Sequence, residues 1–548
     1  MDRRRVALGR AALLGIPLAF VGLFFLYPLV RILDLGLRPD GRLGLGVIAD
    51  VVRDSNLRGV IAFTIGQAAV STVVTLALGL PAAYALSRLR FRGRAVLQAV
   101  AVVPFVLPTV VVGLAFGGGE GSLGALVAAH AFFNVAVVVR VVGAAWAEVD
   151  PALEDAAEEL GARGWRRLTA VMLPLARPAV AGAATLVGLF SFTSFGAALL
   201  LAPPGSATIE VEIWRQTSQF LDLPVAAALT LIQIVFTSAL LVLETRVAGA
   251  RIEGGTALAA ARPPRSRGER TFLRVTAIGL SLFIVVPLAR VAARSLLGPE
   301  GFTLDRYLHV GEARAGGLLR IDPLGAIGVS LGTASTAAVI ALAVGLPASF
   351  ALARGRRDRS LPWIATGLPL GVSAVAVGLG SVIAFRDPPL DIRSSRWMVP
   401  IAQAVVALPF VVRIVAPAVT AIRRDLAEQA AALGASPWRT TVDVTLPVAA
   451  PAIGTAAVFA FAVSIGEFGA TTFLARADAP TMPVAIVRLL GQPGSASLGQ
   501  AYAMASLLMI ATAGFALALG GTAAVLGGRV AGGRDQTLER SRRAGAGS

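Results

Sequence analysis

Two polar stretches of this sequence carry the same residue types at the same spacing, and they are its first candidates for function. One runs from Asp150 to Pro178 and the other from Arg424 to Pro451. Each has an alanine-rich acidic segment, then Leu-Gly-Ala, a Trp-Arg pair and a closing Leu-Pro. Carboxylates, arginines and a tryptophan on a folded polar segment suit contact with another protein. The repeat therefore predicts a docking surface, and no catalytic residue is expected in either copy.

Local rules predict how the first helix of each copy begins. In the first copy, Asp150 is placed to cap a helix with Pro151 at its first position. In the second, Asp425 stands three residues before Glu428, which is the spacing of a capping box. Each copy is thus expected to start with a short capped helix.

Glycine is predicted to end these helices, because a residue without Cβ can adopt the left-handed conformation that terminates a helix. The two glycines are Gly161 and Gly434. Ser436 then predicts the cap of a second short helix, from Trp438 to about Val444. The closing Leu-Pro is expected to keep this short helix from running straight into the next apolar segment.

The rest of the chain is apolar enough to lie in a membrane. Hydrophobic residues make up 56% of the sequence, charged residues 15%, and the mean hydropathy is +0.76, values that exclude an ordinary soluble domain. The predicted fold class is therefore an all-α polytopic membrane protein. Its net charge of +17 fits anionic lipid headgroups and membrane topology, so membrane lipid and not nucleic acid is the expected partner.

Twelve apolar segments are long enough to cross a hydrocarbon core roughly 30 Å thick. They are approximately 11–30, 60–86, 95–115, 122–146, 178–201, 226–248, 273–292, 325–352, 362–385, 398–420, 449–474 and 501–527. We expect the first of them to stay uncleaved, because no small-x-small site follows it.

These segments divide into two halves of six. The predicted domains are a first half at 1–250, a flexible Gly-, Pro- and Arg-rich linker at 251–272, a second half at 273–530 and a tail at 531–548.

Segments on the side of the N-terminus hold 33 of the 49 arginines, so both termini and both polar loops are predicted to face the cytoplasm.

The halves are repeats of one another. Residues 79–86, GLPAAYAL, return at 345–352 as GLPASFAL, and Arg140 and Arg413 occupy corresponding positions 273 residues apart. An even number of spans in each half gives the repeats the same orientation. A pseudo-twofold axis along the membrane normal would then place any pathway between the halves.

The two polar loops resemble the signature loop of bacterial ABC importer permeases, E-A-A-x3-G-x9-I-x-L-P. The first copy reads Asp155-Ala156-Ala157, Gly161, Val171 and Leu173-Pro174, and the second reads Glu428-Gln429-Ala430, Gly434, Val444 and Leu446-Pro447. Asp for Glu, Gln for Ala and Val for Ile are the departures. They leave the resemblance intact but blur which carboxylate matters in the first copy.

In that family the short helix after the glycine is a coupling helix that sits in a cleft of the ATPase subunit. Trp165, Arg166 and Arg167 occupy its position in the first copy, and Trp438 and Arg439 in the second. The resemblance implies two copies of an ABC ATPase subunit and an extracytoplasmic solute-binding protein as partners. It also implies the inner (cytoplasmic) membrane of a bacterium as the location.

The chain lacks the residues that would bind ATP or a metal ion. All 49 basic residues are arginine, whereas a P-loop needs a lysine on the nucleotide phosphates. ATP and Mg²⁺ are therefore expected on the partner ATPase, with no cofactor in this chain. With no cysteine and two distant histidines, no transition-metal site is expected either.

The fusion of two halves in one chain resembles the ferric-iron and thiamine branch of these permeases. AHAFFN at 129–134, ATIEVEIW at 207–214 and SIGEFG at 464–469 lean towards the thiamine permeases. The resemblance thus implies thiamine, thiamine phosphates or ferric iron as the solute.

Polar residues inside apolar segments are the candidates for a pathway. Glu467 is an acid in an apolar segment and would suit a cationic solute if it faced the space between the halves. Alternatively, Glu467 lies near the outer end of its span, where water or an arginine satisfies it. The proposed lining residues are Ser191, Thr193, Ser194, Ser464 and Glu467.

Four further polar residues each allow two interpretations. Arg140 and Arg413 lie where a span enters a polar loop, and extension of their side chains to lipid headgroups is a simpler role than contact with a solute. His130 and Asn134 lie in one span and can pack against other helices or contact a solute. The overall alternatives are an ion-coupled secondary transporter with 12 spans, and a channel or scaffold subunit. Against the first stand the absence of a charged relay through the spans and of an Asp-Arg-Gly loop after the second span, and the other does not account for the doubled loop.

Overall fold

A computed structural model of the chain gives the fold. It describes residues 14–38, 41, 44–117, 121–162, 164–248, 261–298, 301–308, 323–354, 368–388, 390–422, 424–436 and 439–514. Within these ranges the only sheet is a pair of two-residue antiparallel strands, β1 (Leu297–Gly298) and β2 (Gly301–Phe302). All other regular elements there are helices, which confirms the all-α fold class.

Nine helices of the described ranges are long and apolar enough to cross a membrane, or up to eleven if two bent pairs each count as one span. The pairs are Arg94–Val106 with Thr109–Phe116, bent by 103°, and Leu168–Leu175 with Arg177–Phe192, bent by 70°. The predicted span 362–385 is described only from residue 368 onwards. Its helix Ala374–Ala384 is too short to count as a span. A polytopic fold is confirmed, but the number twelve is not.

The elements of the first half are all helical in the described ranges. They are η1 (Gly22–Leu26), α2 (Tyr27–Leu37), α3 (Gly46–Arg53), α4 (Ser55–Arg88), α5 (Arg94–Val106), α6 (Thr109–Phe116), α7 (Leu123–Ala147), α8 (Pro151–Glu159), α9 (Trp165–Arg167), η2 (Leu168–Met172), α10 (Leu173–Leu175), α11 (Arg177–Phe192), α12 (Gly196–Leu201), α13 (Ile209–Ser218) and α14 (Leu223–Ala248).

The second half begins inside the predicted linker. Its elements are α15 (Arg267–Leu296), α16 (Asp305–Leu308), α17 (Pro323–Arg354), η3 (Leu368–Gly371), α19 (Ala374–Ala384), α20 (Met398–Thr420), α21 (Arg424–Ala432), η4 (Thr440–Thr445), α23 (Leu446–Gly466), α24 (Thr471–Leu474), α25 (Met482–Leu490) and a last helix, Ser495–Gly514.

Glycine lets corresponding helices approach closely in the two halves. In the first, α4 packs on α7, and a Cβ on Gly79 would lie 2.6 Å from Cβ of Val138. In the second, α17 packs on α20, and a Cβ on Gly345 would lie 2.6 Å from Cγ1 of Val411. Small residues at such crossings allow the tight helix packing on which membrane bundles depend. The sequence repeat is therefore a structural repeat.

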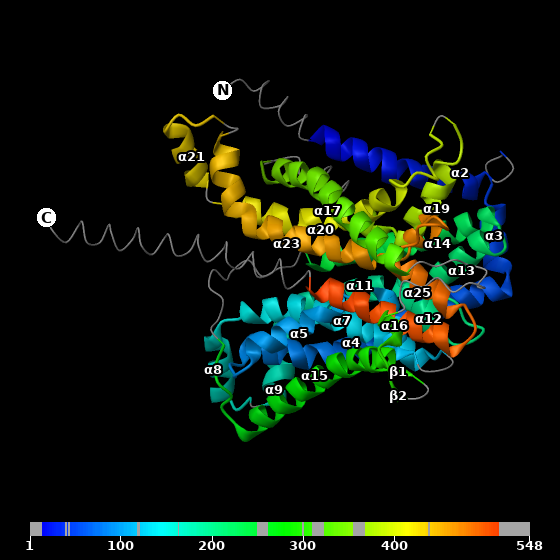
Figure 1. Ribbon diagram of the computed structural model, residues 1–548. Coiled ribbons are helices and arrows are strands. Elements are labelled where there is room, and N and C mark those ends of the chain that lie inside the picture. The colour runs from blue at the N-terminus through cyan, green and yellow to red at the C-terminus, as the bar shows by residue number, and fades with distance from the viewer. Residues whose placement is uncertain are drawn as a thin grey trace.

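The first span of each half contacts the other half. Helix α2 packs against α19 of the second half and about equally against α14 of its own half, and the ring centroids of Tyr27 and Phe385 are 5.8 Å apart. Helix α15 packs against α4, α5 and α6, and the centroids of Phe283 and Phe132 are 6.1 Å apart (Figure 1). The two halves are thus contiguous in sequence but interlocked in space.

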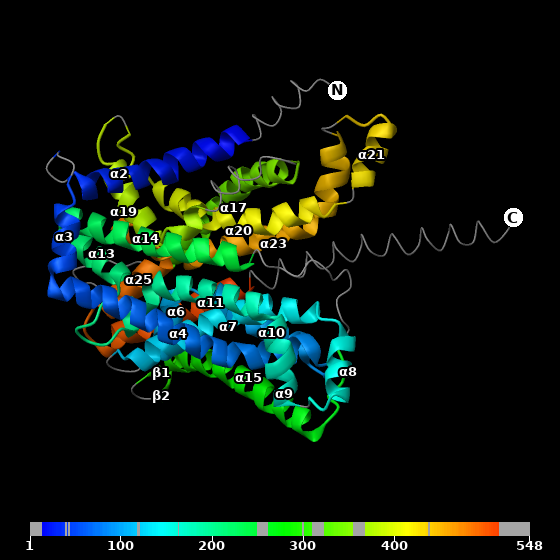
Figure 2. The same cartoon turned by 180° about the vertical axis from the view of Figure 1, so that it is seen from behind.

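The two polar loops lie at one end of the molecule. Figures 1 and 2 show α8, from the first loop, and α21, from the second, at the same end of the helices and on opposite halves. The short helices α3 and α13 lie at the other end. This agrees with the prediction that both loops face the same side of the membrane.

Candidate functional site

The two polar loops, called here the docking loops (150–178 and 424–451), make the same turn. At the end of α8, Gly161 has φ +83°, its N–H donates to the Glu158 carbonyl (3.0 Å), and Ala162 N–H donates to the Ala157 carbonyl (2.8 Å). At the end of α21, Gly434 has φ +84° and the same pair of bonds recurs at 3.0 and 2.9 Å. This is the Schellman arrangement, so the predicted left-handed glycines are confirmed.

The helix starts agree with the prediction in part. The Asp150 carboxylate accepts a hydrogen bond from Ala152 N–H (2.9 Å), as a cap should. Helix α21 instead begins at Arg424, one residue before the predicted cap Asp425, whose side chain lies outside the described part of the chain. The Ser436 hydroxyl accepts from Arg439 N–H (3.3 Å), which supports the cap predicted for the second short helix.

The closing Leu-Pro behaves differently in the two loops. After Leu173-Pro174 the helix axis turns by 70° into α11, as predicted. After Leu446-Pro447 the helix continues without a break from η4 through α23, so there the prediction is wrong. Both prolines follow a π-helical turn, with Leu173 N–H bonded to the Leu168 carbonyl and Leu446 N–H bonded to the Thr441 carbonyl. The bend in the first loop lies at Ala176, between α10 and α11, and the Leu-Pro motif alone does not produce it.

One exposed leucine stands in front of each loop glycine, and sequence reasoning did not select it. Leu160 is 88% exposed and Leu433 is 90% exposed, 273 residues apart. Two large apolar side chains exposed at corresponding positions indicate a contact site for another surface. The signal was present in the sequence, because Leu-Gly-Ala occurs in both copies.

The predicted docking residues lie around these leucines. Asp155, Ala156, Arg166, Glu428, Arg439 and Pro447 are exposed, Leu173, Pro174, Ala430 and Leu446 are half-buried, and Ala157 is buried. Trp165 lies in α9 but its side chain is outside the described part of the structure, as is the whole of Trp438. The exposed members share the loop end of the molecule with Leu160 and Leu433.

A buried ion network holds the first docking loop. The Arg88 guanidinium lies 2.5 Å from the Glu154 carboxylate, with side chains only 5% and 2% exposed. Arg167, 3% exposed, pairs with Glu158 and with Glu269 of α15 (2.5 Å), and donates to the Tyr84 hydroxyl (3.0 Å). These partners come from α4, α8, α9 and α15, so the network joins the loop to two spanning helices.

The end of the predicted linker joins this network. Backbone N–H of Arg262 donates to the Arg88 carbonyl (3.0 Å), and its guanidinium pairs with Glu269 (2.8 Å). Arg265 pairs with Asp155 (2.8 Å) on the exposed side of α8, and this hydrogen bond lowers the pKa of the Asp155 carboxyl below its ordinary value. Residues 262–269 are therefore ordered against the first loop; 249–260, where the linker begins, lie outside the described residues.

The second loop cannot form such a network. The positions that correspond to Glu154, Glu158 and Arg167 are Ala427, Ala431 and Thr440, and Tyr84 is replaced by Phe350. Arg354 stands at the position of Arg88, so the second loop keeps one charge of the network and lacks the others. Ion pairs fix the first loop, and none of the corresponding pairs occurs among the described residues of the second.

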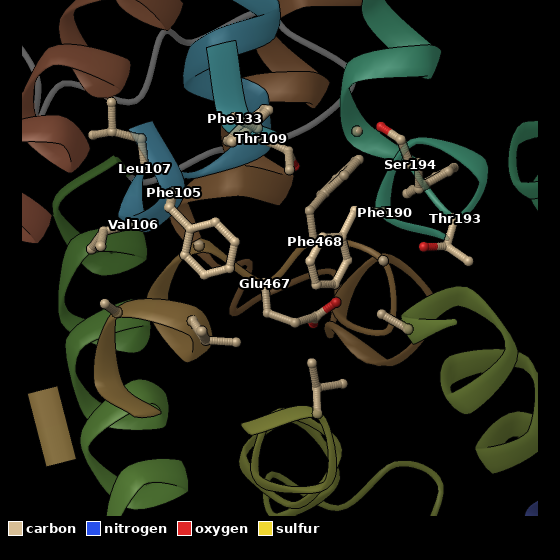
Figure 3. A pocket seen from close by; sticks show the side chains of 18 of the residues that line it. Phe105, Val106, Leu107, Thr109, Phe133, Phe190, Thr193, Ser194, Glu467 and Phe468 are labelled. Carbon is tan, nitrogen blue, oxygen red and sulfur yellow. The ribbon is translucent and has the colours of Figure 1, made fainter. Parts of the chain in front are cut away.

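A cavity of about 280 Å³, called here the outer cavity, lies between the halves. Its wall contains phenylalanines of both halves, among them Phe105, Phe190 and Phe410. Phe195 and Phe468, which correspond in the repeat, stack on each other beside it with centroids 5.1 Å apart. Figure 3 shows the Glu467 side chain in this aromatic surrounding. Such a wall suits a flat or cationic organic solute.

Glu467 also has a local structural role. Its carboxylate accepts from Ala470 N–H (2.7 Å), from Thr471 N–H (3.0 Å) and from the Thr471 hydroxyl. The Glu467 carboxylate thereby caps α24. Glu467 also lines the outer cavity and is only 6% exposed. No arginine pairs with it among the described residues.

The other predicted pathway residues divide into two groups. Thr193 and Ser194 line the outer cavity, whereas Ser191 and Ser464 are fully buried and do not. His130 and Asn134 line it as well. His130 Nδ1 lies 3.0 Å from the Ser71 hydroxyl, while Nε2 makes no hydrogen bond with any described residue.

Comparison with known proteins gives two kinds of match. The family described as "Binding-protein-dependent transport system inner membrane component" matches residues 75–249 and again 359–530. Together these cover more than half of the chain, and each includes one docking loop.

Individual relatives match over different lengths. A thiamine transport system permease protein of Brucella abortus (strain 2308) is 27% identical over 467 residues, 80% of this chain and 83% of the relative. One of Brucella suis biovar 1 matches equally. A putative 2-aminoethylphosphonate transport system permease protein of Salmonella paratyphi A is 31% identical over 223 residues, 39% of this chain and 81% of the relative.

Proposed function

The chain belongs to the family of binding-protein-dependent transport system inner membrane components, and on this premise we propose that each of its docking loops binds one ATPase subunit of an importer. The chain is an ABC importer permease of this type and an integral membrane protein. ATP and Mg²⁺ bind the two ATPase copies, and movement between those copies is passed to the two halves. An extracytoplasmic solute-binding protein delivers the solute at the other end. Because the chain belongs to this family, the alternatives of an ion-coupled secondary transporter and of a channel or scaffold subunit are excluded.

The observation that carries this proposal is the pair Leu160 and Leu433. Both leucines are almost fully exposed, both precede a left-handed glycine, and both loops lie at one end of the molecule. An apolar side chain at the tip of a helix that enters a cleft would be desolvated there, as are the central residues of protein interfaces. Because the two loops each present such a leucine, each needs a cleft of its own, and we infer two copies of the partner ATPase.

The side of the membrane on which the docking loops lie is inferred from the distribution of arginines. Both docking loops face the cytoplasm, where ATP is available, and both termini lie on that side. Residues 1–13 and 515–548, which contain the termini, lie outside the described part of the chain. Reporter fusions at each end measure their location.

The proposed solute is thiamine or a thiamine phosphate, the direction is inward, and ferric iron stays an untested alternative. The aromatic wall of the outer cavity and Glu467 support an organic cation. The thiamine permeases of Brucella match most of the chain, whereas the relative named for 2-aminoethylphosphonate matches less than half of it. Uptake of labelled thiamine by cells that carry the complete transporter, compared with cells lacking this chain, tests the assignment.

The docking proposal is tested by purification of the chain with its ATPase. We expect ATP hydrolysis to co-purify with the tagged chain from its native membranes. In the double variant Gly161→Pro with Gly434→Pro this activity should disappear, since proline cannot adopt a φ of +83°. Gly205→Pro, which strains a glycine with φ +75° in the turn between α12 and α13, is the control. ATPase retained by the double variant would contradict the proposal.

A further inference from the structure

A second cavity, called here the inner cavity, lies between the halves on the side of the docking loops. Its volume is about 320 Å³. It shares Phe105, Phe190 and Phe410 with the outer cavity, so these rings separate the two. Among the described residues that line it, all except Thr455, Arg140 and Arg413 are apolar.

Helix α7 passes along both cavities with one face. His130, Phe133 and Asn134 line the outer cavity, and Val137 and Arg140 line the inner one, at the spacing of three to four residues that marks one side of a helix. At 1.5 Å per residue, Arg140 lies about 15 Å further along α7 than His130, towards the docking loop. The two cavities are therefore successive stations on one path.

The two arginines are a repeat-related pair that faces this path. Arg140 comes from α7 and Arg413 from α20, 273 residues later. Both line the inner cavity, a space bounded by both halves. Within the described residues neither guanidinium forms a hydrogen bond or an ion pair. Glu244 of α14 is the acidic group whose charge acts on Arg413, but it does not line the cavity.

Arg140 and Arg413 are both exposed, so an anion that enters the cavity can replace the water around their guanidinium groups. Arginine presents several N–H donors in a planar fork that matches the oxygens of phosphate, phosphonate or carboxylate. The two arginines are the charged groups among the described residues that line the cavity, and like charges from both halves face one space. Lipid phosphates offer the same chemistry, so the source of the anion has to be tested.

We propose that Arg140 and Arg413 form an anion-binding station in the inner cavity, which takes the phosphate, phosphonate or carboxylate group of the transported solute on its way to the cytoplasm. The assignment rests on the proposed transport function and extends it. The outer cavity contains a carboxylate among aromatic rings and the inner cavity a pair of guanidinium groups. Together they suit a solute that has both a cationic and an anionic group.

The potential of the inner cavity can be measured without the ATPase. The chain has no cysteine, so Thr455→Cys introduces a single thiol into this cavity without further changes. Its rate of reaction with a sulfonate-bearing methanethiosulfonate is compared with that of a trimethylammonium-bearing one. We expect the anionic reagent to be favoured, and the ratio to fall by at least about tenfold when Arg140→Gln and Arg413→Gln are combined.

Two controls separate charge from folding. The double variant Arg140→Lys with Arg413→Lys keeps both charges and should keep the ratio. Leu308→Cys, 75% exposed in α16, reports on a surface without these arginines, and its ratio should not respond to either change. A ratio at Thr455→Cys that is the same with and without the arginine charges would overturn the proposal.

The source of the anion is tested by protection of the same thiol. Thiamine monophosphate and 2-aminoethylphosphonate, added in detergent free of phospholipid, should slow its modification, and thiamine, which lacks the anionic group, should not. Protection should vanish in the Arg140→Gln, Arg413→Gln variant. If phosphatidylglycerol bilayers protect the thiol and these soluble anions do not, the arginines bind lipid and the proposal fails. Neither result depends on the ATPase, so both are distinct from a failure of the docking loops.

Discussion

Phe195 and Phe468 stack face to face, with ring centroids 5.1 Å apart and planes inclined by 16°. They occupy corresponding positions in the two repeats, 273 residues apart, and so mark the place where the halves meet on their pseudo-twofold axis. Both side chains are buried and line the outer cavity. Beside the cavity the two halves thus contact each other through a pair of equivalent residues.

The stacked pair is expected to contribute to the stability of the folded protein. Phe195→Ala and Phe468→Ala should each destabilise by about 3–5 kcal/mol. The double variant should lose less than the sum, because an aromatic pair adds roughly 0.5–1.5 kcal/mol that can be lost only once. Unfolding of the purified variants measures this coupling. Strictly additive losses would show that the stack adds nothing beyond burial.

The ion network of the first docking loop should make that loop sensitive to loss of charge. Arg167→Met leaves Glu154, Glu158 and Glu269 without their shared partner, and we expect destabilisation by about 3–5 kcal/mol. Arg439→Met, at an exposed position of the second loop, should change stability by no more than about 0.5 kcal/mol. Thermal unfolding in detergent compares them. Equal effects would contradict the difference between the loops.

The exposed leucines should matter for association and not for folding. Leu160→Asp and Leu433→Asp remove no buried contact, so the unfolding midpoint should be unchanged. Binding of the ATPase subunit should weaken by roughly tenfold or more in each, as expected for loss of a central interface residue. Leu308→Asp at the other end is the matched control. Titration of the purified ATPase against each variant supplies the affinities.

Glu467 combines a cap with a position in the outer cavity. In Glu467→Gln one oxygen remains to accept from Ala470 N–H or Thr471 N–H, so α24 should persist while the negative charge is removed. We expect uptake of a cationic solute to fall by about tenfold, the equivalent of roughly 1.4 kcal/mol. Uptake kinetics equal to those of the unaltered chain would leave Glu467 with the cap alone.

Gly79, where α4 packs closely on α7, should tolerate no added side chain. Gly79→Val would place Cβ 2.6 Å from Val138 and force the helices apart, which costs roughly 1–3 kcal/mol or more. Gly66→Val in the same helix is the control, because no other atom lies within 4 Å of its built Cβ. Unfolding of both variants in one detergent tests the difference.

Several features of this protein are determined by residues close together in the chain. The helical membrane fold follows from long apolar runs, and the turn at Gly161 and Gly434 follows from the absence of Cβ. The correspondence of the two docking loops can be read from spacing alone. These properties depend on contacts within a few residues, and the sequence is therefore sufficient for them.

The sequence was insufficient where one motif met different surroundings. The helix bends by 70° at Ala176 after Leu173-Pro174 but continues past Leu446-Pro447, although both prolines follow a π-helical turn. The sequence did not decide whether Arg140 and Arg413 contact lipid or lie on the pathway. The packing of α7 and α20 places both on the inner cavity.

Tertiary structure alone decided how the halves interlock and how the first docking loop is fixed. Helix α15 packs on the first half, and this brings Glu269 to Arg167, 102 residues away in the chain. In the second loop Thr440 stands in place of that arginine, and its described residues form no corresponding network. The physical reason is that a buried charge is stable only beside its partners. Which residues become partners is set by the packing of whole helices and not by their local sequence.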